Sequence, residues 1–207
     1  MRIMLLIAFA FACSGCEVLL QPSGMIAEQT TAWRRVATES DRERLRDWRS
    51  TFSTALDAAR KAGHEADIDR EAALLNPDAA LANSAIPNGT YSCRVIKLGA
   101  KGEGNLAYVS YPGFTCQVAQ DGQLQRLSKV SGSQRYVGII FPNDAMRQLF
   151  LGTLVLGDER RALQYGQDEA RDVAGFIERI GPQRWRLLMP KPQFESQIDV
   201  MELVAER

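Results

Sequence analysis

The amino-acid sequence predicts an α+β protein whose N-terminal helices pack on a mostly antiparallel β-barrel, or on a strongly curved sheet of about 8–9 strands. Three observations lead to this prediction. Apolar residues follow a helical period before residue 77, and apolar and polar residues alternate from residue 87 onward. Turn residues separate the alternating segments so closely that no helical crossover fits between them. A sandwich of two sheets is the alternative architecture.

Residues 1–16 are expected to form an export signal. Arg2 gives a short positive start, and the apolar run over residues 3–12 is too short to span a bilayer. We expect Cys16 to carry a lipid, because small residues precede it. Lipidation at Cys13 and a plain secretory signal are the alternatives. Neither cysteine is followed by aspartate, so the expected product is an exported, periplasmic lipoprotein of the outer membrane.

The remainder of the chain is expected to form a tether and one folded domain. Residues 17–30 contain proline and glycine without a sustained period, as a tether does. The domain then covers residues 31–207, helical over 31–76 and β-rich over 87–204. Because the 25 basic and 25 acidic side chains balance, the net charge gives no attraction for nucleic acid.

The strongest helix is expected over residues 41–62. Ser40 and Glu43 have the spacing of a capping box at its start, and Gly63 supplies a stop signal at its end. A weaker helix is expected over residues 65–75. The apolar face of the strong helix consists of Leu45, Trp48, Phe52, Leu56 and Ala59.

Short strand-like segments follow these helices. Asp121–Gly122 has the composition of a two-residue hairpin turn, and Pro112–Gly113 is expected to be another turn. The segment over 149–156 is apolar on both faces and therefore needs cover on both sides, one of them from the 41–62 helix. The expected strands lie at 90–98, 106–111, 114–120, 123–130, 135–141, 149–156, 173–180, 184–189 and 198–204.

Cys93 and Cys116 are expected to form a disulfide. Each cysteine lies on the apolar face of an alternating segment, and an exported protein meets an oxidising environment. Closing a loop of about 24 residues stabilises the fold by roughly 3 kcal/mol in the chain-entropy model. Two thiols alone make a poor metal site, and we expect neither a metal nor another cofactor.

The sequence offers little catalytic apparatus. His64 is the only histidine, and the spacings of a serine nucleophile or of a phosphate-binding loop do not occur. A pair of carboxylates could still serve a hydrolase. The acidic residues that gather in the last third are Asp158, Glu159, Asp168, Glu169, Asp172 and Glu178, and the arginines near them can pair with them instead.

The candidate binding residues are Ser133, Gln134, Arg135, Arg171 and Asp172. The first three place a hydroxyl, an amide and a guanidinium between two apolar strands, where they could hold a carboxylate, a sugar or a peptide backbone. The structural alternative is an irregular turn whose Arg135 pairs with an acid such as Asp172.

The chain resembles the bacterial domain-of-unknown-function family 4893 from Trp33 to Leu203. The resemblance implies an exported bacterial protein and brings no established activity and no catalytic residue. It rests on Asp41-x-x-Arg44-Leu45-x-x-Trp48, Tyr91-x-Cys93, Lys97-Leu98-Gly99, Cys116, Gly132-Ser133-Gln134-Arg135, Phe150-Leu151-Gly152, Gly157-x-Glu159, Tyr165-Gly166, Arg171-Asp172, Arg179-Ile180-Gly181, Trp185-Arg186-Leu187 and Pro190-x-Pro192.

The predicted function is that of a membrane-tethered, non-enzymatic binding or structural module of the cell envelope. Its expected partners are another envelope protein or a small ligand, and the membrane through the lipid anchor. The alternative is a small carboxylate-dependent hydrolase that acts on envelope sugar or peptide. An open barrel interior would favour a ligand, whereas a filled interior with an exposed apolar patch would favour a protein partner.

Overall fold

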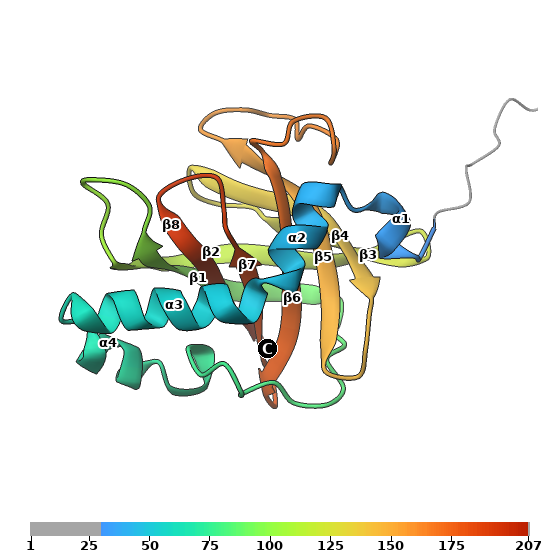
Figure 1. The fold of residues 1–207 in the computed structure, drawn as a ribbon. Helices are drawn as coiled ribbons and strands as arrows, with labels where there is room; N and C mark the ends of the chain where they lie inside the picture. The colour runs from blue at the N-terminus through green and yellow to red at the C-terminus, as the bar shows by residue number, and fades with distance from the viewer. Residues whose placement is uncertain (1–29, 207) are drawn as a thin grey trace, which may run out of the picture.

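Eight antiparallel strands close into a barrel in chain order, with β8 paired to β1 (Figure 1). The computed structural model describes residues 30–206. The α+β prediction is confirmed, and the barrel rather than the sandwich is the architecture. An isolated bridge between Leu81 and Arg179 adds one further antiparallel pairing outside the named strands. The strands are β1 (Gly89–Ala100), β2 (Tyr108–Asp121), β3 (Leu124–Lys129), β4 (Gln134–Pro142), β5 (Arg147–Leu156), β6 (Asp172–Gly181), β7 (Arg184–Pro190) and β8 (Ser196–Ala205).

The two strands expected at 106–111 and 114–120 form a single strand, β2. The predicted turn at Pro112–Gly113 is wrong, because β2 runs through both residues. The register of β2 against β1 shifts opposite Cys93 and Val95, which makes this point a β-bulge. Proline has no N–H for the ladder and glycine accepts unusual backbone angles, so a bulge is where a strand accommodates this pair.

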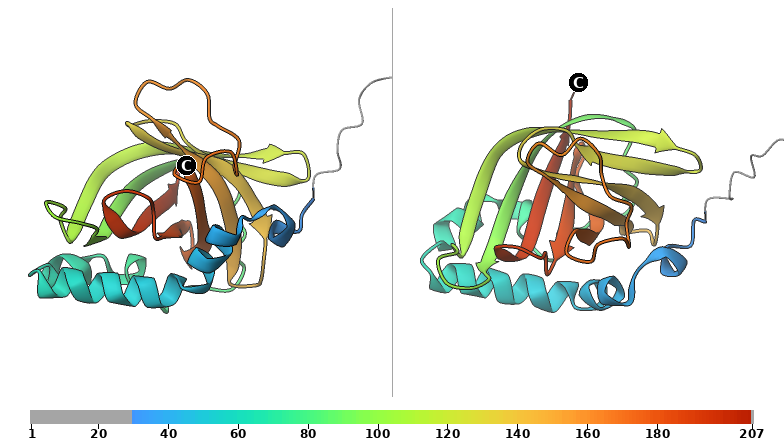
Figure 2. Two further views of the ribbon diagram at one scale, coloured as in Figure 1. Left: turned by 45° about the horizontal axis from the view of Figure 1, so that its top comes forward. Right: turned by 90° about the horizontal axis from the view of Figure 1, so that it is seen from above.

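The helices lie along one side of the barrel (Figure 2). The expected 41–62 helix is two helices that change direction at Asp47. The predicted cap is also wrong, since the Thr38 hydroxyl accepts the Asp41 N–H at 3.2 Å and the first of the two helices starts at Glu39. Gly63 does follow the end of the second, with a φ of 93°. The helices are α1 (Trp33–Val36), α2 (Glu39–Arg46), α3 (Trp48–Lys61) and α4 (Glu65–Arg70), followed by a 3₁₀ turn at Ala72–Leu74.

Apolar packing covers both faces of the barrel wall. Tyr91, Phe150 and Trp185 belong to the cluster that fills the interior. On the outside, Phe52 of α3 and Leu45 of α2 pack against the strands beneath them. The doubly apolar β5 therefore has the two-sided cover that its sequence requires, with Phe150 inside and its outward neighbours under α2.

The two ends of the barrel differ in the length of their connections. Because neighbouring strands run in opposite directions, the four loops after the odd-numbered strands meet at one end, which we call the mouth. The longest of them, orange in Figure 1, rises above the barrel. Tight turns at 122–123, 143–146 and 182–183 join the strands at the other end. The mouth loops are 101–107, 130–133, 157–171 and 191–195.

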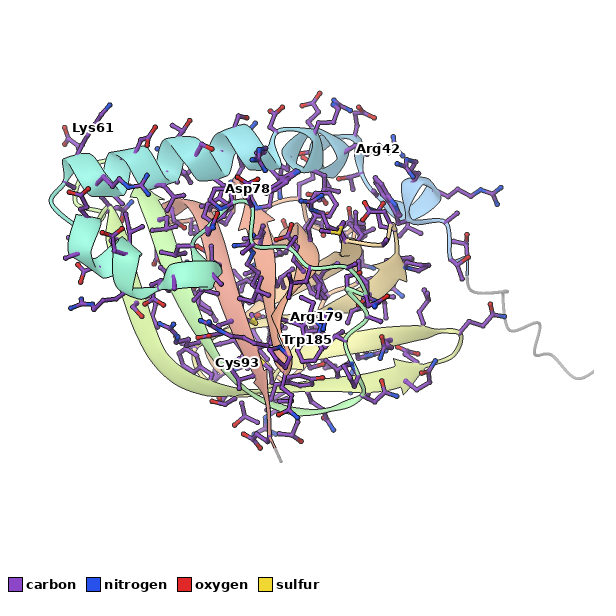
Figure 3. All side chains as sticks on the ribbon, turned by 90° about the horizontal axis from the view of Figure 1, so that it is seen from below. Arg42, Lys61, Asp78, Cys93, Arg179 and Trp185 are labelled. Atoms are coloured by element: carbon purple, nitrogen blue, oxygen red, sulfur yellow. A yellow bond between two sulfur atoms is a disulfide. The ribbon has the colours of Figure 1, made fainter. Side chains whose placement is uncertain are left out.

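The predicted disulfide is confirmed. Cys93 of β1 and Cys116 of β2 are bonded, with their Cα atoms 5.9 Å apart. Both cysteines are buried in the interior cluster, which also contains Trp185 of β7. Figure 3 shows Cys93 and Trp185 among the side chains of the barrel. The alternation of apolar and polar residues therefore predicts correctly that both cysteines face inward.

Candidate functional site at the barrel mouth

A cavity of about 200 Å³ opens at the mouth, above the packed interior. Side chains of the first four strands and of the 130–133 and 191–195 loops form its wall. Two lysines and three aromatic rings share this wall. The lining residues are Val95, Lys97, Tyr111, Phe114, Lys129, Ser133, Gln134, Tyr136 and Glu195.

A buried network around Asp199 lies beside the cavity. The fully buried carboxylate of Asp199 accepts hydrogen bonds from Lys97 Nζ at 2.9 Å, Tyr136 Oη at 2.7 Å and Ser196 Oγ at 2.5 Å. The Glu195 carboxylate lies 3.2 Å from Lys97 Nζ as well. Lys97 is therefore matched by negative charge, as a buried cation requires.

The Asp199 network also fixes the charge of its members. Burial on its own would lower the pKa of Lys97, but the attraction and hydrogen bonds to Asp199 and Glu195 together outweigh it and the pKa is raised. Burial raises the pKa of the Tyr136 phenol, and Asp199 raises it further. At neutral pH this part of the wall therefore presents an ammonium ion and a neutral phenol, both already engaged.

Lys129, at the end of β3, has a different environment. Its ammonium group donates to the carbonyl oxygens of Ser131 at 2.9 Å and Gln134 at 2.7 Å, and it lies 3.5 Å from the centroid of the Phe114 ring. Burial lowers its pKa to about 8, with smaller contributions from the positive charges of Arg135 and Lys97.

Two of the predicted binding residues, Ser133 and Gln134, do line the cavity. Arg135 has another role, and the alternative in which it pairs with an acid such as Asp172 is wrong, because its partners are backbone carbonyl oxygens. Its guanidinium donates to the carbonyl oxygens of Gly132 at 3.2 Å, Gly157 at 2.7 Å and Glu159 at 2.6 Å. Arg135 thereby ties the 130–133 loop to the 157–171 loop at the mouth.

Arg171 and Asp172 hold the base of the 157–171 loop. Arg171 pairs with Glu159 at 2.9 Å, and Asp172 accepts the N–H of Gly166 at 2.9 Å. Burial raises the pKa of the Asp172 carboxyl. Together with Gln134, both residues also line a small second cavity next to the first. The structure therefore gathers all five predicted binding residues around the mouth, although three of them position loops.

The sequence reasoning missed the two lysines, yet a signal for them exists. Lys97 has the same parity along β1 as the inward-facing Cys93 and Val95. Lys129 likewise follows the inward-facing Leu127 by two residues. A charged residue at an inward position of a barrel strand indicates either a buried ion pair or a ligand site.

The acidic residues of the last third serve mainly as structural partners. Glu178, fully buried on the outer face of β6, pairs with Arg186 and with Arg147, each at 2.6 Å. We expect from strand alternation that Trp185 faces inward and the arginines beside it face solvent. Trp185 does lie in the interior, but Arg186 is fully buried and donates to carbonyl oxygens of the segment after α4.

A closed eight-stranded antiparallel barrel with a polar and aromatic cavity at its mouth defines the class of this protein. The model of one protein family, described as Domain of unknown function (DUF4893), matches residues 33–203. The chain belongs to this family. Neither the curated proteins nor the solved structures contain a match.

Two further findings concern residues 30–206. Within this part of the chain, no helix is both long and apolar enough to cross a membrane. No group of three or more histidine, cysteine or acidic side chains in this part has a geometry that could hold a metal ion. Cys13 and Cys16 lie outside the described residues.

Proposed function

We propose that this protein is a membrane-tethered, non-enzymatic binding module of the cell envelope, and that its barrel mouth binds a small ligand. The observation that supports this proposal most directly is the mouth cavity of about 200 Å³ above a filled barrel interior. Pockets for drug-sized ligands measure about 300–1,000 Å³, so this cavity suits a molecule the size of one substituted ring.

The chemistry of the cavity wall supports a ligand that is partly apolar. Val95, Tyr111 and Phe114 supply apolar and aromatic surface, while Ser133 and Gln134 offer a hydroxyl and an amide near the opening. A combination of apolar or aromatic surface with polar groups is typical of small-molecule sites, because the apolar surface provides affinity and the polar groups fix orientation.

A plug in the mouth tests this proposal. Ser133 is exposed at the rim, so Ser133→Trp fills the cavity without disturbing the core. Exposed Ser53 on α3 provides the matched control, Ser53→Trp. Amide NMR spectra titrated with small monocyclic compounds should show shifts confined to mouth residues in wild type and Ser53→Trp, and none in Ser133→Trp. Shifts elsewhere, or shifts that persist in the plugged variant, refute binding at the mouth.

The location is a separate part of the proposal. The Cys93–Cys116 disulfide supports export, because disulfides persist in oxidising compartments. Lipidation of Cys16 predicts that Cys16→Ser releases the protein from the membrane fraction into the soluble periplasmic fraction. Cys13→Ser is the matched control and should stay with the membrane. Membrane association that survives Cys16→Ser would exclude this anchor.

A protein partner is the second candidate, and exposed apolar side chains favour it. Each of the four mouth loops carries one that is more than two-fifths exposed: Leu106, Val130, Leu163 and Phe194. Exposed apolar side chains that gather at one end of a protein can mark an interaction surface. Cross-linking in intact envelopes should then capture a partner. The double variant with Leu106→Asp and Phe194→Asp should lose this cross-link.

A further inference from the structure

The two lysines of the mouth cavity differ in how their charge is compensated. Lys97 has two carboxylates within 3.2 Å, those of Asp199 and Glu195. Lys129 is only 3% exposed, and none of the ion pairs within residues 30–206 includes it. Its ammonium group is bonded to neutral carbonyl oxygens and faces the Phe114 ring. The wall therefore contains one matched cation and one cation without a counterion.

We propose that the ligand of the mouth is a small monoanion, a carboxylate on an apolar or aromatic body, whose carboxylate pairs with the Lys129 ammonium group. This inference rests on the proposed binding function of the mouth and names its ligand class. A buried charge without a counterion is costly, and an incoming carboxylate supplies the missing charge.

The charges around Lys129 support an anion rather than a cation. Lys97 and Arg135 both act on it as positive neighbours. Asp199 is engaged by Lys97, Tyr136 and Ser196, and its charge is therefore already compensated.

Among the other groups that line the cavity, Glu195 is the one negative group, and it opposes an incoming anion. It stands at the rim, with its side chain 43% exposed and paired to Lys97. Solvent screens such a charge, so its opposition is weaker than the attraction of the buried Lys129. Burial and the neighbouring Asp199 raise the pKa of Tyr136, so its phenol is neutral at neutral pH and adds no charge to the wall.

The remaining wall fits the apolar body of the ligand. Phe114, Tyr111 and Val95 provide ring and aliphatic surface around the ammonium group. One cation with counterions and one cation without a counterion suit a single negative charge better than a dianion. Benzoate has this combination of one carboxylate and one ring, and benzamide is its uncharged counterpart of nearly the same shape.

Calorimetric titration of the purified protein with benzoate and with benzamide tests the inference. At pH 7, benzoate should bind wild type about tenfold more tightly than benzamide does, since a hydrogen-bonded charge pair contributes that much. Lys129→Met should remove this difference while benzamide still binds. Lys61→Met at the far end of α3 (Figure 3) is the matched control and should preserve it.

The pH dependence of wild type provides a test that needs no variant. The pKa of the Lys129 ammonium group is about 8 in the free protein and a paired carboxylate raises it, so the affinity for benzoate should be constant below pH 8, fall about tenfold in total as the pH passes from the pKa of the free protein to that of the complex, and then level off. The affinity for benzamide should stay constant over the same range. Near pH 8, benzoate binding should also take up protons, which calorimetry in buffers of different ionisation enthalpy detects.

A second pair of variants separates crowding of Lys129 from loss of a special backbone angle. A Cβ on Gly132 would lie 2.8 Å from both Lys129 Nζ and Phe114 Cε1, the two groups that would hold the carboxylate and the ring, whereas one on Gly63 would meet nothing within 4 Å. Both glycines have positive φ, so Gly63→Ala carries a similar backbone cost without touching the cavity. Gly132→Ala should therefore weaken benzoate binding and Gly63→Ala should not.

The outcomes separate this inference from the function on which it rests. Equal affinities of wild type for benzoate and benzamide would overturn the anion assignment and leave binding at the mouth in place. Failure of both compounds to bind at millimolar concentration would count against the mouth as a site for small aromatic ligands. Selective binding of benzoate that survives Lys129→Met would overturn the role of Lys129.

Discussion

The buried pair of Glu178 and Arg186 makes a sharp prediction about stability. Both Nε and Nη2 of Arg186 donate to Glu178 Oε2, at 2.8 and 2.6 Å, and both side chains are fully buried between the barrel and the helices. Arg147 donates to the other carboxylate oxygen at 2.6 Å. Glu178→Gln keeps the shape of this carboxylate and removes its charge from between the two guanidinium groups.

The structure sets the size of the effect. Breaking a buried ion pair by removing one charge costs about 3–5 kcal/mol, because the remaining charge is left uncompensated. Arg186 Nη1 keeps three carbonyl acceptors, and the glutamine oxygen can still accept. We therefore expect the lower end, about 3 kcal/mol. With a slope of about 2 kcal/mol/M in urea, the unfolding midpoint should fall by about 1.5 M.

Urea unfolding followed by circular dichroism measures this difference. Glu43→Gln is the control, because Glu43 forms an exposed pair with Arg46 at 3.6 Å and should change stability by less than about 0.5 kcal/mol. If Glu178→Gln lowered the midpoint no more than Glu43→Gln, the burial and pairing argument for Arg186 would be refuted.

Two further predictions concern the disulfide and the 157–171 loop. Replacing both Cys93 and Cys116 with alanine should lower the free energy of unfolding by about 3 kcal/mol. A reductant should destabilise wild type and leave the double variant unchanged. Equal unfolding midpoints of wild type with and without reductant would contradict this prediction. Arg171 lowers the pKa of Glu159 to about 2, so the stability from this ionised carboxylate is present above pH 4.5 and is lost as the pH falls towards 2. Carbon NMR should show Arg171→Gln raising that pKa towards 4.5, and a wild-type value already near 4.5 would contradict the pairing.

The sequence was sufficient for the antiparallel β character of the barrel and for the inward facing of its cysteines. Alternation placed Cys93 and Cys116 on inward faces, and the two-sided apolar pattern of β5 required cover that α2 supplies. Both deductions rest on the two-residue period of a strand, which is a local property. The spacing of turns excluded crossovers and hence parallel pairing.

The closure of the barrel and the exact bounds of its helices and strands could be learned only from the structure. Pairing of β8 with β1 joins residues 96 to 114 positions apart, and no local pattern distinguishes it from a sandwich. The bulge at Pro112–Gly113 has the same composition as a turn. Thr38 and Ser40 are both good capping residues, and only the backbone geometry decides between them.

The sequence predicts part of the wall of the mouth cavity. Ser133 and Gln134 were identified as an unusual polar segment between strands, and they do line the mouth. The strand alternation could also have identified Lys97 and Lys129 as inward-facing residues of the cavity wall. Which of these two cations has a counterion could not be read from the chain, because Asp199 is 102 residues from Lys97 and reaches it through closure of the barrel.

The location of a bound ligand tests the central claim most directly. Crystals grown or soaked with 4-bromobenzoate give an anomalous signal that places the bromine, and electron density places the carboxylate. We expect one molecule in the mouth, with its ring against Phe114 and Tyr111 and its carboxylate within hydrogen-bond distance of Lys129 Nζ. A ligand bound only on the outer surface of the barrel, with the mouth cavity empty of it, would contradict the account.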